Sequence, residues 1–151
     1  MRQAIISNVI GLFFLFYMTV ALASETVVFG NEQVRVDNHV LHVEVAVTGQ
    51  AKRQGLMFRS FMPKDEGMLF VYHPVIPVFF WMKNTLIPLD ILYFDKMGRL
   101  FGESLNTPPC RADPCPLYSS KKPVAYVLEL NAGVTKKLGI KIGTKLSLFH
   151  S

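Results

Sequence analysis

The chain has 151 residues, half of them hydrophobic, with 16 lysines and arginines against 11 aspartates and glutamates. This length suits one ordinary domain with a buried core. The excess of positive charge is small, and no arginine cluster is interleaved with aromatic residues, so nucleic acid is not an expected partner.

The first 23 residues are predicted to be a secretory signal peptide. Arg2 gives them a basic start, and an apolar run over residues 9–23 ends in a small-x-small pattern at Ala21 and Ala23. The run is shorter than the roughly 18 residues that span a membrane, so an uncleaved membrane anchor is the weaker alternative. We therefore expect an exported protein, periplasmic or secreted, with one domain over residues 24–151.

The remaining chain consists mainly of short strand-like segments with a two-residue hydrophobic period. A short helix is expected at residues 50–54, with Thr48 as its cap and Gly55 at its end. A second helix is expected at 132–138, begun by Asn131. Strands are predicted at residues 26–29, 34–36, 41–47, 67–72, 78–82, 91–94, 100–105, 124–130 and 146–149.

These segments predict a mainly β protein, a compact single-domain sandwich or barrel with one or two short helices. Residues 78–82 are apolar on both faces, which is typical of a central strand covered from two sides. Residues 107–123 contain five prolines and are predicted to form a loop.

Polar side chains interrupt the apolar segment 79–95. Lys83, Asn84 and Asp90 lie there, where an unpaired charge would be very costly, so each should be paired, hydrogen-bonded or solvated in a cleft. On a strand, Trp81 and Lys83 share one face, and an ammonium beside a tryptophan suits the rim of a pocket. The alternative is that Lys83 pairs with a carboxylate and only stabilises the strand end.

Glu129 is the other carboxylate of interest. It alternates with Ala125 and Val127 on one side of its strand, so partial burial is expected. We expect Lys83, or Arg59 in its place, to neutralise Glu129 or Asp90 beside a cleft. A carboxylate held in this way would act as a general acid or base only with a shifted pKa and a positioned substrate.

Cys110 and Cys115 lie in the proline-rich segment. Two cysteines in an exported chain predict a disulfide. Four residues separate them, whereas redox pairs have two, so redox activity and metal binding are weaker alternatives.

No metal or cofactor is expected. The four histidines lack the spacing of metal ligands; they are His39, His42, His73 and His150. A Cu(I) site would need thioether ligands, but the methionines of the central segment match no helix face or strand register, and packing is their commoner use. Those methionines are Met57, Met62, Met68 and Met82.

Several sequence strings resemble the domain-of-unknown-function 192 (DUF192) family of small β-rich proteins: GLMFR, GMLF, FWMKNT-x-x-PLDI, PC-x-x-x-PC-P-x-Y and VLELNAG. The resemblance covers roughly residues 41–146. It implies a compact, mainly β fold and no agreed activity, ligand or catalytic residue. The chain departs from the family at Thr144, where an acidic residue is usual. The matching positions are Gly55, Leu56, Met57, Arg59, Gly67, Met68, Trp81, Met82, Lys83, Asn84, Pro88, Asp90, Glu129, Leu130 and Gly133.

The favoured hypothesis is a non-catalytic domain that binds an unknown small or extended ligand in a cleft around the FWMKNT-x-x-PLD segment. One alternative is a hydrolase-type enzyme using Asp90 or Glu129 as acid or base. Another is a protein-interaction or envelope-structural module. The candidate ligand-binding residues are Arg59, Trp81, Lys83, Asn84, Asp90 and Glu129.

Overall fold

The computed structural model describes residues 27–149, so the predicted signal peptide lies outside the described residues. The described part contains nine strands and two short helices, which confirms the predicted mainly β class. Within it, no helix has the length and apolar character needed to cross a membrane. The elements are β1 (Gly30–Val36), β2 (His39–Ala46), α1 (Gly49–Gln54), β3 (Glu66–Ile76), β4 (Phe79–Trp81), β5 (Leu89–Phe94), β6 (Leu100–Thr107), β7 (Leu117–Ser119), β8 (Val124–Asn131), α2 (Val134–Lys137) and β9 (Leu146–Leu148).

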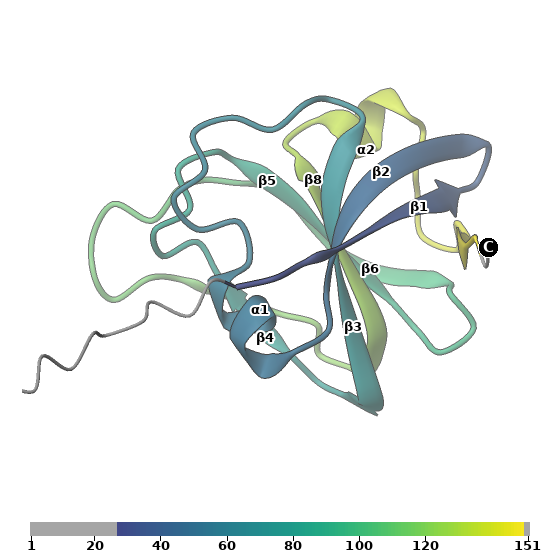
Figure 1. Cartoon of the computed structure of the whole chain (residues 1–151), viewed down its shortest axis with the longest axis horizontal. Coiled ribbons are helices and arrows are strands. Elements are labelled where there is room, and N and C mark those ends of the chain that lie inside the picture. Colours follow the sequence, from purple (N-terminus) through teal and green to yellow (C-terminus); the bar gives the residue numbers. More distant parts are fainter. Residues whose placement is uncertain (1–26, 150–151) are drawn as a thin grey trace, which may run out of the picture.

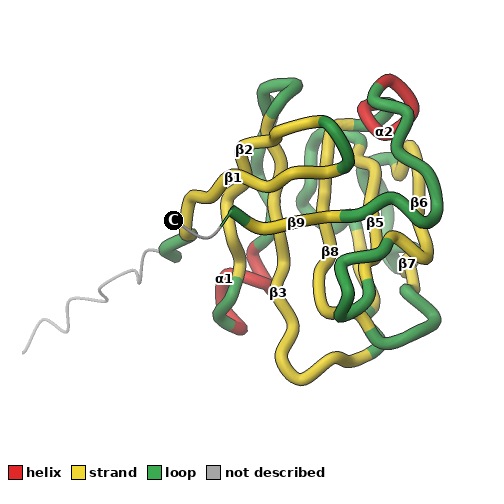
Figure 2. The backbone as a smooth tube through the Cα atoms, turned by 90° about the vertical axis from the view of Figure 1, so that its right-hand side faces the viewer, coloured by secondary structure: helices red, strands yellow, loops and turns green. Residues whose placement is uncertain are grey.

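Seven strands form a strongly twisted, curled sheet in the order β6-β5-β8-β3-β2-β1-β9 (Figures 1 and 2). Only β2 and β3 are parallel among these pairs; the others are antiparallel. The two ends of the sheet meet where Arg99 forms a bridge with Lys145, and the Leu100 N–H donates to the Thr144 carbonyl at 2.9 Å. The sheet is therefore a partly closed barrel, one of the two architectures that the sequence predicts.

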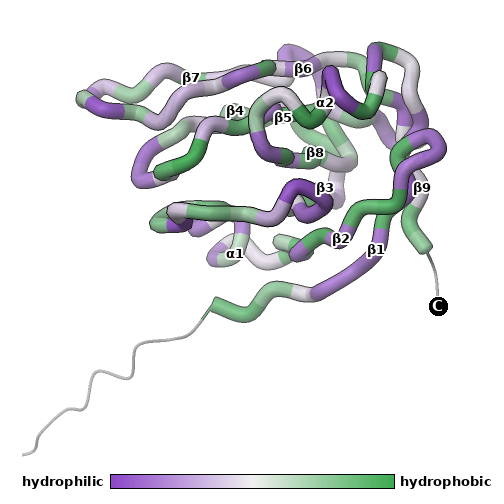
Figure 3. Tube along the Cα trace, turned by 90° about the horizontal axis from the view of Figure 1, so that it is seen from above, coloured by the Kyte–Doolittle hydropathy of each residue, from purple (hydrophilic) through white to green (hydrophobic). Residues whose placement is uncertain are grey.

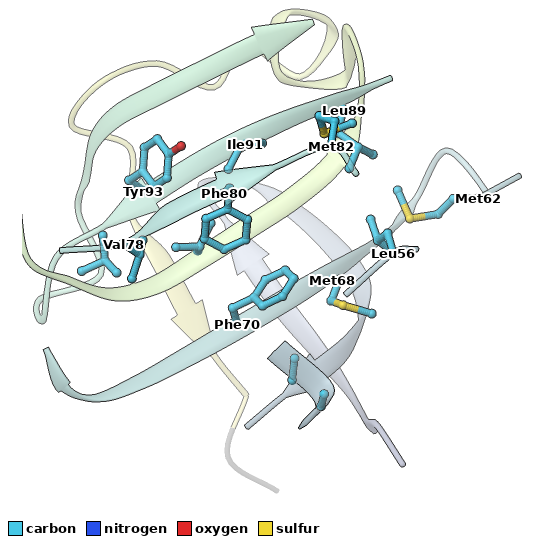
Figure 4. Packing of buried hydrophobic residues seen from close by; sticks show 14 of the residues in the cluster. Leu56, Met62, Met68, Phe70, Val78, Phe80, Met82, Leu89, Ile91 and Tyr93 are labelled. Carbon is cyan, nitrogen blue, oxygen red and sulfur yellow. The ribbon is translucent and has the colours of Figure 1, made fainter. Parts of the chain in front are cut away.

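The curled sheet buries apolar side chains on both faces. Hydrophobic and hydrophilic residues alternate along β2 (Figure 3), and its inward residues join a cluster that draws on both ends of the sheet. The opposite face of the central strands is covered by α1 and by a separate two-stranded sheet of β4 and β7. Phe70 of β3 and Phe80 of β4 meet edge to face across this second layer, with ring centroids 5.0 Å apart (Figure 4).

The prediction of a central strand at residues 78–82 is wrong. The strand β4 pairs only with β7, and Phe80 is buried while Phe79 and Trp81 are 66% and 48% exposed. Because β4 and β7 lie as an outer layer over the large sheet, one of their faces looks toward solvent. The partner β7 falls inside the proline-rich segment that the sequence predicts as loop.

The first predicted strand is also displaced. Residues 27–29 lie outside any strand, and β1 begins at Gly30. The helix prediction at 50–54 is confirmed, because α1 spans Gly49–Gln54 and Thr48 caps it.

The predicted disulfide between Cys110 and Cys115 is confirmed. It closes the loop that precedes β7, and Asp113 lies inside this loop. Its Cα–Cα distance of 5.6 Å lies within the usual range for a disulfide. The Cys110 N–H donates to the Met82 carbonyl at 3.2 Å, which holds the start of this loop next to the end of β4.

Candidate functional site

Glu129 is a buried carboxyl group in the middle of the large sheet. Its strand β8 pairs with β5 and β3, and the Cα partners of Glu129 are Ile91 and Met68. The residue is 4% exposed, on the sheet face that α1 and β4 cover. Among residues 27–149, no cation forms an ion pair with this carboxyl and no group donates a hydrogen bond to it.

A cleft of about 30 Å³ opens beside this carboxyl, and we refer to it as the Glu129 cleft. Buried Phe70 and Phe80 form part of its wall, while the half-exposed Trp81 reaches it from β4. Figure 1 shows α1 and β4 beside each other at this side of the molecule. The remaining lining residues come from α1, the turn after it, and the turn after β4: Lys52, Arg53, Gln54, Gly55, Leu56, Met57 and Thr85.

The local sequence around α1 forms one side of the cleft. The Thr48 hydroxyl accepts from the Ala51 N–H at 3.1 Å and so caps the helix. Gly55 ends it with φ of 47° and ψ of −135°. A Cβ on Gly55 would approach the Phe70 ring to 3.3 Å, so both the turn and the close packing favour glycine here. The turn brings Leu56 and Met57 to the cleft.

Burial dominates the electrostatics of the cleft. It raises the pKa of Glu129 to about 8 from its ordinary value of 4.5, because the low-dielectric surroundings disfavour the carboxylate. The pKa of Tyr72 is raised to about 12, first by burial and then by the nearby Glu129. Burial likewise raises the pKa of Tyr93. At neutral pH the Glu129 carboxyl is therefore mostly protonated and able to donate a hydrogen bond.

Lys52 lies at the same cleft without reaching the carboxyl. Its Nζ atom sits 4.5 Å from the centroid of the Tyr72 ring, a cation–π contact. Desolvation lowers the pKa of Lys52. The rim of the cleft thus carries a cation held on an aromatic face, above an acid that has no counter-charge among the described residues.

Trp81 belongs to an exposed apolar surface on the outer face of β4 and β7. Trp81 pairs with Leu117 across the two strands, and Phe79 lies two residues before it on the same face. The three are 48%, 63% and 66% exposed, respectively. We call this group the aromatic surface; it adjoins the Glu129 cleft through Trp81.

Lys83 and Arg59 are paired differently from the sequence expectation. Lys83 Nζ lies 5.7 Å from the Trp81 ring and 3.2 Å from Asp113 Oδ2, inside the disulfide loop. Arg59 forms a two-pronged ion pair with Glu44, which raises the pKa of Arg59. The prediction that either cation neutralises a central carboxylate is therefore wrong for the described residues.

Asp90 ties the end of β6 to the start of α2 and is not among the residues that line the cleft. It is 1% exposed, and its carboxylate accepts from the N–H groups of Asn106 at 2.9 Å, Gly133 at 3.0 Å and Thr135 at 3.1 Å. It thereby caps α2, a role that the sequence assigns to Asn131. The Asn131 side chain donates instead to the carbonyls of Met62 and Pro63.

Asn84 shapes the turn after β4. It adopts a left-handed conformation with φ of 57°, which asparagine tolerates better than most residues. Its carbonyl accepts from the Phe58 N–H at 2.7 Å. This hydrogen bond ties the GLMFR and FWMKNT segments together beside the Glu129 cleft.

The structure brings together two of the six candidate residues, Trp81 and Glu129, at one cleft, with Lys83 beside Trp81. Sequence reasoning missed Lys52, Tyr72 and Thr85. A signal for Tyr72 was present, because it continues the alternation of Met68 and Phe70 along β3. Lys52 and Thr85 lie on short turns and helix ends, where no hydrophobic period indicates their direction.

Three of the four methionines of the central segment pack into the core. Met62, Met68 and Met82 are at most 5% exposed and belong to the cluster between the two layers. Among the described residues, no group of three or more histidine, cysteine, aspartate or glutamate side chains has the geometry of a metal site.

Comparison with known families identifies this chain. Residues 32–148 match the model of the DUF192 family, described as "Uncharacterized ACR". The chain belongs to this family, as its sequence strings indicate. No curated protein matches the chain.

Two solved structures are similar over 82% of this chain. One is a protein of Sinorhizobium meliloti 1021, provisionally described as a transcription regulator, with 41% identity, 97% of its chain covered and a TM-score of 0.76. The other is a protein of unknown function from Novosphingobium aromaticivorans DSM 12444, with 32% identity, 94% of its chain covered and a TM-score of 0.73. Both agree with the fold described above.

The raised pKa of Glu129 gives a testable pH dependence of stability. The unfolded chain ionises this group near 4.5 and the folded chain near 8, so between these values only the folded state keeps the proton. The free energy of unfolding should fall by about 1.4 kcal/mol per pH unit in this window and level off above it.

Urea denaturation at pH 5, 6, 7 and 8 measures this effect on wild type and Glu129→Gln. The variant has no titrating carboxyl at this position, so its free energy of unfolding relative to that of wild type should rise steadily from pH 5 to 8. The exposed residue Glu103 supplies the control substitution Glu103→Gln, which should show no such trend. A Glu129→Gln difference that stays constant with pH would contradict the assignment.

Replacing Asp90 with alanine should destabilise the protein by about 3 kcal/mol, because three backbone N–H groups lose their shared acceptor. Asp113→Ala removes an exposed ion pair and should change stability by less than about 0.5 kcal/mol. Chemical denaturation of both variants compares them directly. Equal effects would show that Asp90 does not hold α2 and the β6 end in place.

Proposed function

We propose that this protein binds a small or extended ligand at the Glu129 cleft and the adjoining aromatic surface. The observation that carries the proposal is the buried Glu129 carboxyl, which opens to the cleft without a partner among residues 27–149. A buried polar group without a partner costs stability, and such groups concentrate at functional sites. Trp81 and its exposed neighbours provide apolar contact area beside it.

The protonated carboxyl and the aromatic surface provide two different kinds of contact to a ligand. The surface offers a wide apolar platform on which a ring or chain can lie. The cleft offers the Glu129 carboxyl in a space of about 30 Å³. A few polar groups beside an apolar contact area are typical of ligand binding.

Acid catalysis by Glu129 is the second candidate function. A pKa of about 8 suits a general acid near neutral pH. Asp90 does not share this role, because its carboxylate is occupied by three backbone N–H groups. Turnover of a bound ligand by wild type, lost in Glu129→Gln with binding retained, would favour the enzyme over the binding protein.

A thermal-shift screen tests the proposed binding function. It covers metals, sugars, cell-wall fragments, nucleotides and amino acids against the oxidised chain. We expect at least one class to raise the melting temperature of wild type and to lose this effect in Trp81→Ala. Phe61→Ala is the matched control, because Phe61 is 75% exposed and lines a different cavity.

Retention of the shift in Phe61→Ala would assign the ligand to the aromatic surface. Equal shifts in wild type and Trp81→Ala would refute the proposed site, and so would the lack of any shift across the panel. In that last case, a search for protein partners by crosslinking would take precedence.

We also propose that the chain is exported, with cleavage after Ala23. The disulfide supports this, because disulfides persist in oxidising compartments. Mass spectrometry of the protein from the envelope and secreted fractions should give a chain that begins at Ser24 and has no free thiols. A cytoplasmic protein that retains Met1 and reacts with a thiol reagent would contradict export.

A further inference from the structure

The Glu129 cleft is too small for most ligands to enter whole. Its volume of about 30 Å³ exceeds the 10–15 Å³ that one water needs by roughly a factor of two. A sugar ring or a nucleobase does not fit in this space. A bound ligand must therefore lie on the aromatic surface and send the tip of a slender chain into the cleft.

The chemistry of the cleft selects among such tips. The Glu129 carboxyl is buried and has no counter-charge among the described residues. A methyl tip would leave the carboxyl unpartnered, and an anionic tip would bind only while the carboxyl keeps its proton. An ammonium is compact, supplies three donors and brings the missing positive charge. Phe80, a buried aromatic residue of the lining, favours a cation as well.

We propose that the cleft receives the ammonium end of an unbranched aliphatic amine, either a free alkylamine or the side chain of a lysine in a peptide. This inference rests on the proposed binding function and specifies its ligand class. On binding, the Glu129 carboxyl releases its proton to solvent and pairs with the ammonium, so the charge inside the cleft stays balanced.

Other charged and titratable groups around the carboxyl are accounted for. Tyr72 of β3 and Tyr93 of β5 stay neutral, because their pKa values are raised. Lys52 of α1 lies over the Tyr72 ring, and the exposed Arg53 also lines the cleft. Both cations oppose an incoming ammonium. Lys52→Met should therefore tighten amine binding, and this effect has the opposite direction from loss of a ligand-binding residue.

Trp81 is the single tryptophan of the chain, so its fluorescence reports on this site directly. The first panel is n-butylamine, n-butanol and butyrate, three chains that differ in the terminal group. The second is Nα-acetyl-lysine methylamide with its norleucine counterpart, which separates a peptide source from a free amine. Wild type, Glu129→Gln and Lys52→Met are titrated between pH 6 and 9, where these amines remain protonated.

The expected result is saturable binding of an ammonium ligand by wild type, at least tenfold weaker in Glu129→Gln and tighter in Lys52→Met. Apparent affinity should rise about tenfold from pH 6 to 7 and level off above pH 8, because binding requires the carboxylate; Glu129→Gln should lack this rise. A fluorescence response to n-butylamine would identify a free amine as the ligand. A response to the lysine derivative alone would identify a lysine side chain of a peptide.

Two outcomes overturn the inference. Equal binding of n-butanol and n-butylamine, lost in Trp81→Ala, would leave the proposed binding site standing and remove the ammonium as its ligand. No binding of any amine at any pH would also overturn the inference, while a hit among sugars or nucleotides in the thermal-shift screen would still support the wider proposal.

Discussion

The carboxyl group of Glu129 is buried from solvent, and no cation among residues 27–149 forms an ion pair with it. Its position follows from the sheet, because β8 lies between β5 and β3 and its opposite face is also buried, through Leu128 and Leu130. An ionised carboxylate would be very costly there. The low-dielectric surroundings therefore keep it protonated at neutral pH, and this single constraint gives the site its character.

The second layer of the fold is arranged around that group. The strands β4 and β7 cover the central strands, and α1 closes the opposite side of the cleft. The Phe70–Phe80 contact holds the layers together, while the Asn84–Phe58 hydrogen bond joins the turns that follow α1 and β4. A polar cleft thus lies within the otherwise apolar contact between the two layers. Such a cleft lowers stability, which is typical of functional sites.

The sequence predicts the class of fold, most strand positions, α1 and the disulfide, because these depend on local period and short-range chemistry. It also indicates that Glu129 is partly buried. It does not predict the ion pairs, since Lys83 meets Asp113 across 30 residues and Arg59 meets Glu44 through the packing of distant segments. The sequence places Asp90 at a cleft, whereas its partners are backbone N–H groups that sequence patterns do not reveal. The central-strand prediction for residues 78–82 failed because exposed aromatic residues resemble buried ones in sequence.

A carbon-13 NMR titration of the Glu129 side-chain carboxyl, assigned with the Glu129→Gln variant, tests the central claim most directly. The expected result is a single titration with a midpoint near pH 8, far above the ordinary value of 4.5. A midpoint close to 4.5 would mean that the carboxyl is solvated or paired in solution. The buried, protonated acid on which the proposed site depends would then not exist.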